Sequence, residues 1–311
     1  MRSIVGTIAL VAGSWIASTA AAQVADFSTF RLVYYVQNDP DTQPVTEDSA
    51  ALFLNLRTTN PDDALNVNVT LPFQTTPIGI PEVTPTIYQY FSGYYPTQAA
   101  LQADYPAGEY YFTIDGGTLG DDNGAIWVPE PLYPEQIPYF TFDTLTNLNG
   151  MDTSADFYGT INGYLPVPEA DENLIFIAVY LACGGGDQLG GFYADPTTTQ
   201  FVIPAGTLSP GRQYVIAAFY SARRYFTGGF ASGASSYAAF DRSTQAVFNT
   251  GYNGCLADLT GEGTVDFGDF LAFFNAYDTS DTLADLDGCN GVDFADFLLF
   301  FNAYDLGCGE G

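Results

Sequence analysis

The sequence predicts a mostly β protein, in which two β-sandwiches are followed by a small helical module. Three observations support this fold class. Short runs of Val, Ile, Tyr, Phe and Thr alternate with Gly, Pro, Asn and Asp from about residue 27 to residue 250, a pattern typical of short strands joined by turns. A proline-rich segment divides that region once. Near the C-terminus a 22-residue motif occurs twice, with 16 identical positions and an offset of 27 residues.

The first 22 residues are typical of a secretory signal peptide. One positive charge, Arg2, precedes an apolar stretch that ends in the small residues Ala20, Ala21 and Ala22. We therefore expect a secreted chain that begins at Gln23. No later segment reaches the roughly 18 consecutive apolar residues that span a bilayer, so membrane insertion is not expected.

The composition excludes several classes of function. The chain has 36 acidic residues and seven arginines, with no lysine and no histidine. Such a surface repels the phosphates of nucleic acids. The lack of histidine excludes Ser-His-Asp triads and zinc sites with imidazole ligands. Pairs of acids could serve a glycosidase, but no spacing in the sequence distinguishes one pair. We expect a protein without catalytic activity.

Strand-like segments occur throughout the β region. The clearest are FRLVYYVQ, ALFLNLR, EYYFTI, NLIFIAVYLA, TTQFVIPA and QYVIAAFYS. Residues 96–106 could instead form a short helix or a turn. Four prolines within WVPEPLYPEQIPYF predict a stiff, extended connector. The predicted domains are therefore a first sandwich at 23–137, a second at 138–251 and the helical module at 252–311.

A similar short sequence motif occurs on each side of this connector. Pro106 precedes Tyr110 by four residues in YPAGEYYFTI, and Pro210 precedes Tyr214 by four in LSPGRQYVIAAF. The second phrase resembles the L-x-P-G-x-x-Y run of fibronectin type III and related immunoglobulin-like sandwiches. In that fold the tyrosine begins a strand and hydrogen-bonds back across the corner. The resemblance implies immunoglobulin-like sandwiches, and an architecture alone does not supply a function.

The repeated motif has the spacing of an EF-hand calcium loop. Oxygen-bearing side chains stand at positions one, three, five, nine and twelve, a glycine makes the bend at position six, and position seven offers its backbone carbonyl. The predicted Ca²⁺ ligands of the first loop are Asp258, Thr260, Glu262, Thr264, Asp266 and Asp269. Those of the second loop are Asp285, Asp287, Gly291, Asp293 and Asp296. Cys289 at position five removes one oxygen and Asn290 replaces the glycine, so we expect the second loop to bind Ca²⁺ more weakly or to use a water molecule as the missing ligand.

One amphipathic helix is predicted after each loop. Four apolar residues at i, i+3, i+4 and i+7 form the stripe expected to pack the two helices against each other: Phe267, Phe270, Leu271 and Phe274, repeated as Phe294, Phe297, Leu298 and Phe301. Phe273 and Phe300 lie off this stripe, with Tyr277 and Tyr304 one turn later. They could contact a partner or pack on the neighbouring sandwich.

Two loop–helix units without a leading helix resemble the dockerin module. The segment from Cys255 to Cys308 is similar to the GC-type dockerin-like C-terminal domain of secreted planctomycete proteins. The resemblance covers about 55 of the 311 residues. It implies calcium-dependent docking onto a cohesin-like domain or another scaffold at the cell surface. Positions ten and eleven are often Ser-Thr in cellulosomal dockerins, but here they are Phe267-Gly268 and Phe294-Ala295, which favours a surface component other than a familiar cohesin.

Four cysteines in an exported chain indicate disulfides. We favour a bond between Cys255 and Cys308, which bracket the module. Cys183 and Cys289 would then be either bridged between domains or free.

A second class of function is a secreted polysaccharide-active enzyme or carbohydrate-binding protein with the same anchor. Aromatic side chains on a sandwich can stack on sugar rings, although most aromatic residues of β proteins belong to the core. The candidates are Tyr34, Tyr35, Tyr88, Tyr90, Tyr94 and Tyr95.

Overall fold

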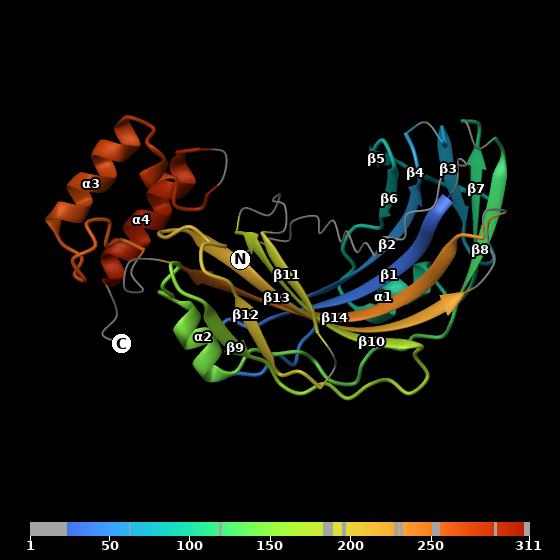
Figure 1. Cartoon of the computed structure of the whole chain (residues 1–311), viewed down its shortest axis with the longest axis horizontal. Coiled ribbons are helices and arrows are strands. Elements are labelled where there is room, and N and C mark those ends of the chain that lie inside the picture. Colours follow the sequence, from blue (N-terminus) through green and yellow to red (C-terminus); the bar gives the residue numbers. More distant parts are fainter. Residues whose placement is uncertain are drawn as a thin grey trace.

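The protein is mostly β (Figure 1). The computed structural model describes residues 24–61, 63–117, 120–182, 189–194, 197–226, 230, 233–250, 256–288 and 291–307. All four cysteines, and with them the predicted disulfides, lie outside these ranges, as does the expected signal peptide. No helix in the described ranges is both long enough and apolar enough to cross a membrane.

One eight-stranded sheet extends through both predicted sandwiches. Its order is β11 (Gly190–Ala194), β10 (Glu172–Leu181), β13 (Gln213–Phe226), β14 (Ser235–Asn249), β1 (Val24–Val36), β2 (Ser49–Thr58), β6 (Ile87–Phe91) and β5 (Glu82–Thr84). At its centre β1 and β14 pair in parallel, from Asp26 opposite Ser235 to Val36 opposite Gln245. The remaining neighbours pair antiparallel.

The predicted boundary between residues 137 and 138 separates two cores but not two sheets. The parallel pair joins the first strand of one predicted sandwich to the last strand of the other. β1, β13 and β14 contain 13, 14 and 15 residues. At about 3.3 Å per residue, each strand is roughly 40–50 Å long and can line both cores. The two predicted sandwiches therefore share one sheet, which corrects the expectation that each is self-contained.

Both of these cores lie on the same face of the long sheet. The first core is closed by β3 (Asn66–Thr70), β4 (Ile78–Ile80), β7 (Gly108–Asp115), β8 (Asp122–Val128) and α1 (Gln98–Asp104). The second is closed by β9 (Phe157–Thr160), β12 (Gln200–Ile203) and α2 (Phe142–Leu148). Strand β14 contributes to both cores from one side of the sheet, because alternate side chains of a strand share a face. Ala238 and Phe240 belong to the first core, and Ala246 and Phe248 belong to the second.

The opposite face of the sheet carries a third apolar cluster. Its buried members are Phe30, Leu32, Tyr34, Ala51, Phe53, Phe176, Ala178, Ala217, Phe219 and Ala239. Each of them belongs to a strand of this same sheet. In Figure 1 the sheet bends around this side, while α2, β9, β12, β7 and β8 lie outside the bend. We call it the concave face.

The structure confirms the local elements that the β region predicted. The six strand-like segments lie in β1, β2, β7, β10, β12 and β13, and residues 98–104 form a helix that Thr97 caps. Both tyrosines hydrogen-bond back across a corner. The Oη of Tyr110 donates to the carbonyl of Pro106 at 3.0 Å, and the Oη of Tyr214 accepts from the backbone N–H of Ser209 at 2.9 Å. Helix α2 was not expected, because seven residues are too few to show the helical spacing of apolar side chains.

The C-terminal module consists of α3 (Phe267–Asp278), a 3-10 helix (Thr282–Ala284) and α4 (Phe294–Leu306), each α-helix preceded by an acidic loop. The module lies at one end of the long sheet (Figure 1). It contacts the start of β13, where the backbone N–H of Gln213 donates to the carbonyl of Leu286 at 3.1 Å.

Candidate metal centre

The last part of each acidic loop is also the start of a helix. The backbone N–H of Asp266 donates to Asp269 Oδ2 at 2.9 Å, and Asp266 Oδ1 accepts from the N–H of Gly268 at 2.5 Å. The Asp266 carboxylate also accepts from the backbone N–H of Asp269, and the resulting reciprocal capping box fixes loop positions nine and twelve relative to each other. Asp293 and Asp296 form the same box at the start of α4.

The first residue of loop one shapes its turn from inside. Asp258 is fully buried and its Oδ1 accepts from the N–H groups of Gly261 at 2.8 Å and Glu262 at 3.1 Å. Its Oδ2 accepts from the N–H of Gly263 at 2.7 Å. Gly261 and Gly263 have φ angles of 76° and 89°, a conformation that favours glycine. The chain therefore curls around one carboxylate, and the following side chains converge.

Three carboxylates come together in each loop. Oxygens of Glu262, Asp266 and Asp269 all lie within 4.8 Å of one another in the first loop. Oxygens of Asp285, Asp287 and Asp296 do the same in the second. Calcium–oxygen bonds of about 2.4 Å place ligands on opposite sides of the ion about 4.8 Å apart. Both sets consist only of oxygen and fit a hard divalent cation such as Ca²⁺.

Two carboxyl groups of the first loop have pKa values that are shifted in opposite directions. The neighbouring carboxylate of Asp266 raises the pKa of Glu262, and Asp269 and Asp258 raise it further. Burial raises the pKa of Asp269, but hydrogen bonds from the N–H groups of Asp266 and Thr260 lower it more, so it lies below its usual range. A cation between these groups would relieve the repulsion around Glu262.

The structure does not gather every predicted ligand. Asp258 and Asp293 lie outside the two three-carboxylate sets. Thr260 lies next to the first set, because its Oγ1 donates to Asp269 Oδ1 at 2.9 Å. The two residues predicted to act through their carbonyls, Thr264 and Gly291, are exposed at position seven.

The helix packing corrects the predicted apolar stripe. Phe273 and Phe300, expected to lie off the stripe, are fully buried between α3 and α4. Phe267 and Phe294, expected to pack, are each 65% exposed, and Leu271 and Leu298 are each 46% exposed. The residues of α3 that face α4 include 270, 273 and 277. They form a stripe with the same helical spacing as the predicted one, but rotated around the helix axis by about one residue.

One residue at this site could not be found from the sequence. Arg212, just before β13, has its Nη1 3.4 Å from Asp285 Oδ2, and its Nη2 donates to the carbonyl of Thr282 at 2.9 Å. About 70 residues separate these partners along the chain. A positive charge of the sheet region therefore lies beside the first acidic residue of the second loop.

Comparisons with known proteins identify no family. No protein family and no curated protein match the chain. It is similar to the FN1-FN3 domains of chicken CNTN1, at 11% identity over 68% of this chain and 66% of that chain, with a TM-score of 0.22. It is also similar to trypsin-activated alpha-2-macroglobulin from Escherichia coli, at 11% identity over 73% of this chain and 16% of that chain, with a TM-score of 0.23. The chain spans less than two thirds of either, and TM-scores this low carry no argument about function.

Proposed function

We propose that this is a secreted, non-catalytic protein whose C-terminal module is a calcium-dependent anchor of the GC-type dockerin-like kind. The module would attach the β region to a cohesin-like domain or another scaffold outside the cell. Glu262, Asp266 and Asp269 would hold one Ca²⁺, with Asp258 shaping the loop around it. Asp285, Asp287 and Asp296 would hold the second.

The observation that supports this proposal most is the repetition of one loop geometry. The backbone N–H of Asp266 donates to Asp269 at 2.9 Å, and 27 residues later that of Asp293 donates to Asp296 at 2.8 Å. In each copy the carboxylate at position twelve is fully buried. The other two acids of each set are exposed in the first loop and half-buried in the second, and carboxylates within 4.8 Å of one another repel unless a cation compensates their charge. A bound Ca²⁺ would supply that compensating charge.

Metal binding should also be coupled to the folding of the module. Its core is small, and the carboxylates of each loop repel one another without a cation. The binding free energy of the metal would then contribute to the stability of the folded state.

The finer fold that we propose for the β region is a pair of immunoglobulin-like sandwiches that share their largest sheet. The two tyrosine corners, at Tyr110 and Tyr214, support this proposal. The parallel pairing of β1 and β14 joins the two units.

Calcium titration of residues 23–311 by calorimetry tests the anchor proposal. We expect two binding events of unequal affinity in wild type, the loss of one event in Asp269→Asn and the loss of the other in Asp296→Asn. Asp278→Asn removes the same charge from an exposed position outside both loops and should keep both events. The absence of binding in wild type, or binding that survives both loop substitutions together, would contradict the proposal.

The docking step needs a separate measurement. Isolated cell envelopes of the producing organism should retain residues 23–311 in Ca²⁺ and release them in chelator. The double variant Asp269→Asn, Asp296→Asn should not be retained under either condition. Retention that is the same with and without Ca²⁺ would separate metal binding from anchoring and refute the calcium-dependent anchor.

A further inference from the structure

An apolar pocket lies at the edge of the second core, between the long sheet and β12. On the side of the long sheet it is lined by Ile175 and Ile177 of β10 and Phe192 of β11. On the other side it is lined by Phe201 of β12. Its volume is about 290 Å³, and it is open to solvent where its lining includes the half-buried Phe192 and the exposed Gln200. A small molecule can therefore enter this space from outside.

The pocket exists because the second core is covered by fewer strands than the first. Four strands, β4, β3, β7 and β8, form the sheet over the first core, whereas β12 and β9 form the sheet over the second. β11 is the last strand of the long sheet, and β12 pairs with β9 alone among the strands that the structure describes. No described strand closes the space between the free edges of β11 and β12.

The side chain of Phe201 leaves this space unfilled. Phe201 pairs with Gly159 on β9, and a Cβ atom at Gly159 would lie only 2.3 Å from the Phe201 ring. The centre of the same ring lies 6.1 Å from that of Phe140 and 6.5 Å from that of Phe157. The ring thus leans over β9, away from the free edge of β12. Glycine at position 159 permits this arrangement because it has no Cβ atom.

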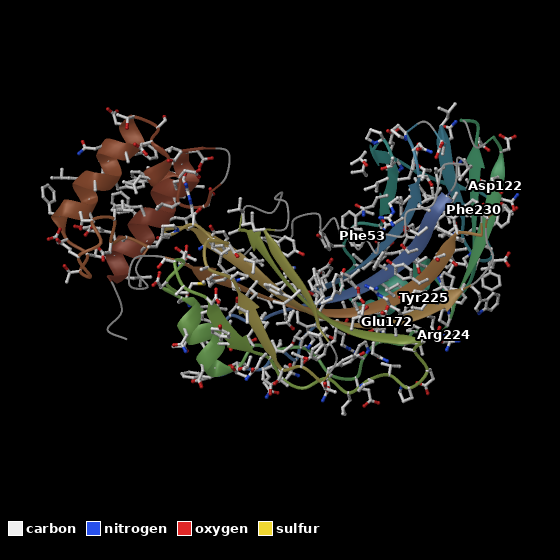
Figure 2. All side chains as sticks on the ribbon, viewed as in Figure 1. Phe53, Asp122, Glu172, Arg224, Tyr225 and Phe230 are labelled. Atoms are coloured by element: carbon white, nitrogen blue, oxygen red, sulfur yellow. The ribbon has the colours of Figure 1, made fainter. Side chains whose placement is uncertain are left out.

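The lining of the pocket carries no charge in the part of the chain that the structure describes. Its hydrogen-bonding side chains are the half-buried Thr198 and the exposed Gln200, both neutral. Glu172, the one charged residue of β10, is already paired. Tyr225 donates a hydrogen bond to it, and Arg223 Nη1 lies 3.4 Å from its Oε2 (Figure 2 labels Glu172 and Tyr225).

These features select a neutral, mostly apolar ligand. An apolar cavity of about 150 Å³ holds one benzene molecule, so about 290 Å³ suits a molecule of roughly ten to twelve carbon atoms. An anionic head group would find no cation in the described lining, and the chain, with its formal charge of −29, would repel it. A sugar chain would bring many hydroxyl groups to a lining that can pair with few of them.

We propose that this pocket binds a neutral medium-chain amphiphile, such as a fatty alcohol. Its alkyl chain would lie over Ile175, Ile177 and Phe201. Its hydroxyl group would lie at the mouth, beside Thr198 and Gln200. The site is separate from the acidic loops and does not depend on the proposed anchor.

The tyrosines that the sequence offered for stacking on sugar rings do not line this pocket. Tyr35 and Tyr88 belong to the first core, and Tyr90 and Tyr95 pack against that core. Tyr34 belongs to the third apolar cluster, and the ring of Tyr94 lies 6.0 Å from that of Tyr34.

A fluorescence displacement assay with residues 23–311 tests this proposal. The neutral dye N-phenyl-1-naphthylamine is bound first, and 1-decanol or decanoate is then added. Decanol should displace the dye equally well with and without chelator, and decanoate should bind at least about threefold more weakly because of its charge. Ile175→Phe fills the pocket and should weaken decanol binding by about tenfold or more, because the alkyl chain is no longer buried.

Thr198→Trp is a second variant, which narrows the mouth of the pocket from a half-buried position. It should weaken decanol binding even if Ile175→Phe does not fold, as circular dichroism would show. Val247→Phe is the matched control. It adds the same ring to the long sheet at a residue of β14 that is 52% exposed, and Ala246 and Phe248 on either side face the second core. It should leave binding unchanged.

Three results would overturn the proposal. The first is a wild-type protein that does not bind decanol, and the second is decanoate binding that is as tight as that of decanol. The third is full binding of decanol by the folded pocket variants. A dimer in light scattering that Thr198→Trp dissociates would also overturn it if decanol does not bind, because a second copy of the chain would then occupy the pocket.

Discussion

The rings of Phe273 and Phe300 stack with centroids 4.1 Å apart and planes only 1° from parallel. They are equivalent positions of the 27-residue repeat, and their neighbours follow the same two-fold relationship. The ring centroids of Phe270 and Phe301 lie 6.1 Å apart, and those of Phe274 and Phe297 lie 6.0 Å apart. The sequence repeat is therefore a structural repeat, in which each loop–helix unit buries the other.

This symmetry predicts that the two central rings are equally important for stability. Phe273→Ala and Phe300→Ala should each lower the free energy of unfolding of the module by about 3–5 kcal/mol, because each leaves a cavity in a small core. Phe267→Ala, at a position that is 65% exposed, should cost less than about 1 kcal/mol. Chemical unfolding followed by helical circular dichroism measures all three. A larger loss for Phe267→Ala than for Phe273→Ala would refute the packing.

The buried carboxyl of Asp241 predicts an unusual dependence of stability on pH. Burial raises the pKa of Asp241 from its ordinary 3.8 to about 6, although Ser221 and Arg223 oppose the shift. The folded state then binds more protons than the unfolded state between these values, so its stability falls as the pH rises through this window. The contribution of this group is about 3 kcal/mol.

Urea unfolding at pH 4 to 7 checks this prediction. Asp241→Asn should be more stable than wild type at pH 7 and should lose the decline between pH 4 and pH 6. Asp278→Asn, which removes an exposed charge, is the control and should follow wild type. Parallel curves for wild type and Asp241→Asn would show that Asp241 titrates normally.

The two proposed calcium loops should differ in affinity because only the first has an acidic side chain at position five. Glu262→Ala removes this oxygen and should weaken the tighter site by on the order of tenfold, since affinity follows the number of charged ligands. The second site should keep its affinity. Asp305→Ala, exposed near the end of α4, provides a charge-matched comparison in calorimetric titration. Equal effects of the two substitutions would argue against Glu262 as a ligand.

Arg212 should weaken Ca²⁺ binding at the second proposed site. Its guanidinium lies 3.4 Å from Asp285 and competes with a cation for that carboxylate. Arg212→Gln should therefore raise the affinity of the second site by up to about fivefold, the range expected for a weak ion pair. Arg224→Gln, which removes an arginine of β13 that pairs with Asp171, should leave both sites unchanged. Calorimetric titration distinguishes these outcomes, and a weaker second site in Arg212→Gln would contradict the competition.

Local patterns determined most elements of this protein. The β-branched and aromatic residues of β1 and β13 predict their strands, because such side chains favour extended backbone. The spacing of Tyr214 from Pro210 predicts a corner bond that the structure contains. The capping boxes at Asp266 and Asp293 likewise join residues three positions apart. Interactions over so few residues are fixed by backbone geometry alone.

Long-range packing decided the rest. Only the fold pairs β1 with β14, about 200 residues later, and so merges the two predicted sandwiches into one sheet with a concave face. Only the docking of α3 on α4 buries Phe273 instead of Phe267, although both lie on apolar stretches of the same helix. A strand or helix pattern states which residues share a face. It does not state which partner covers that face, because the partner comes from a distant part of the chain.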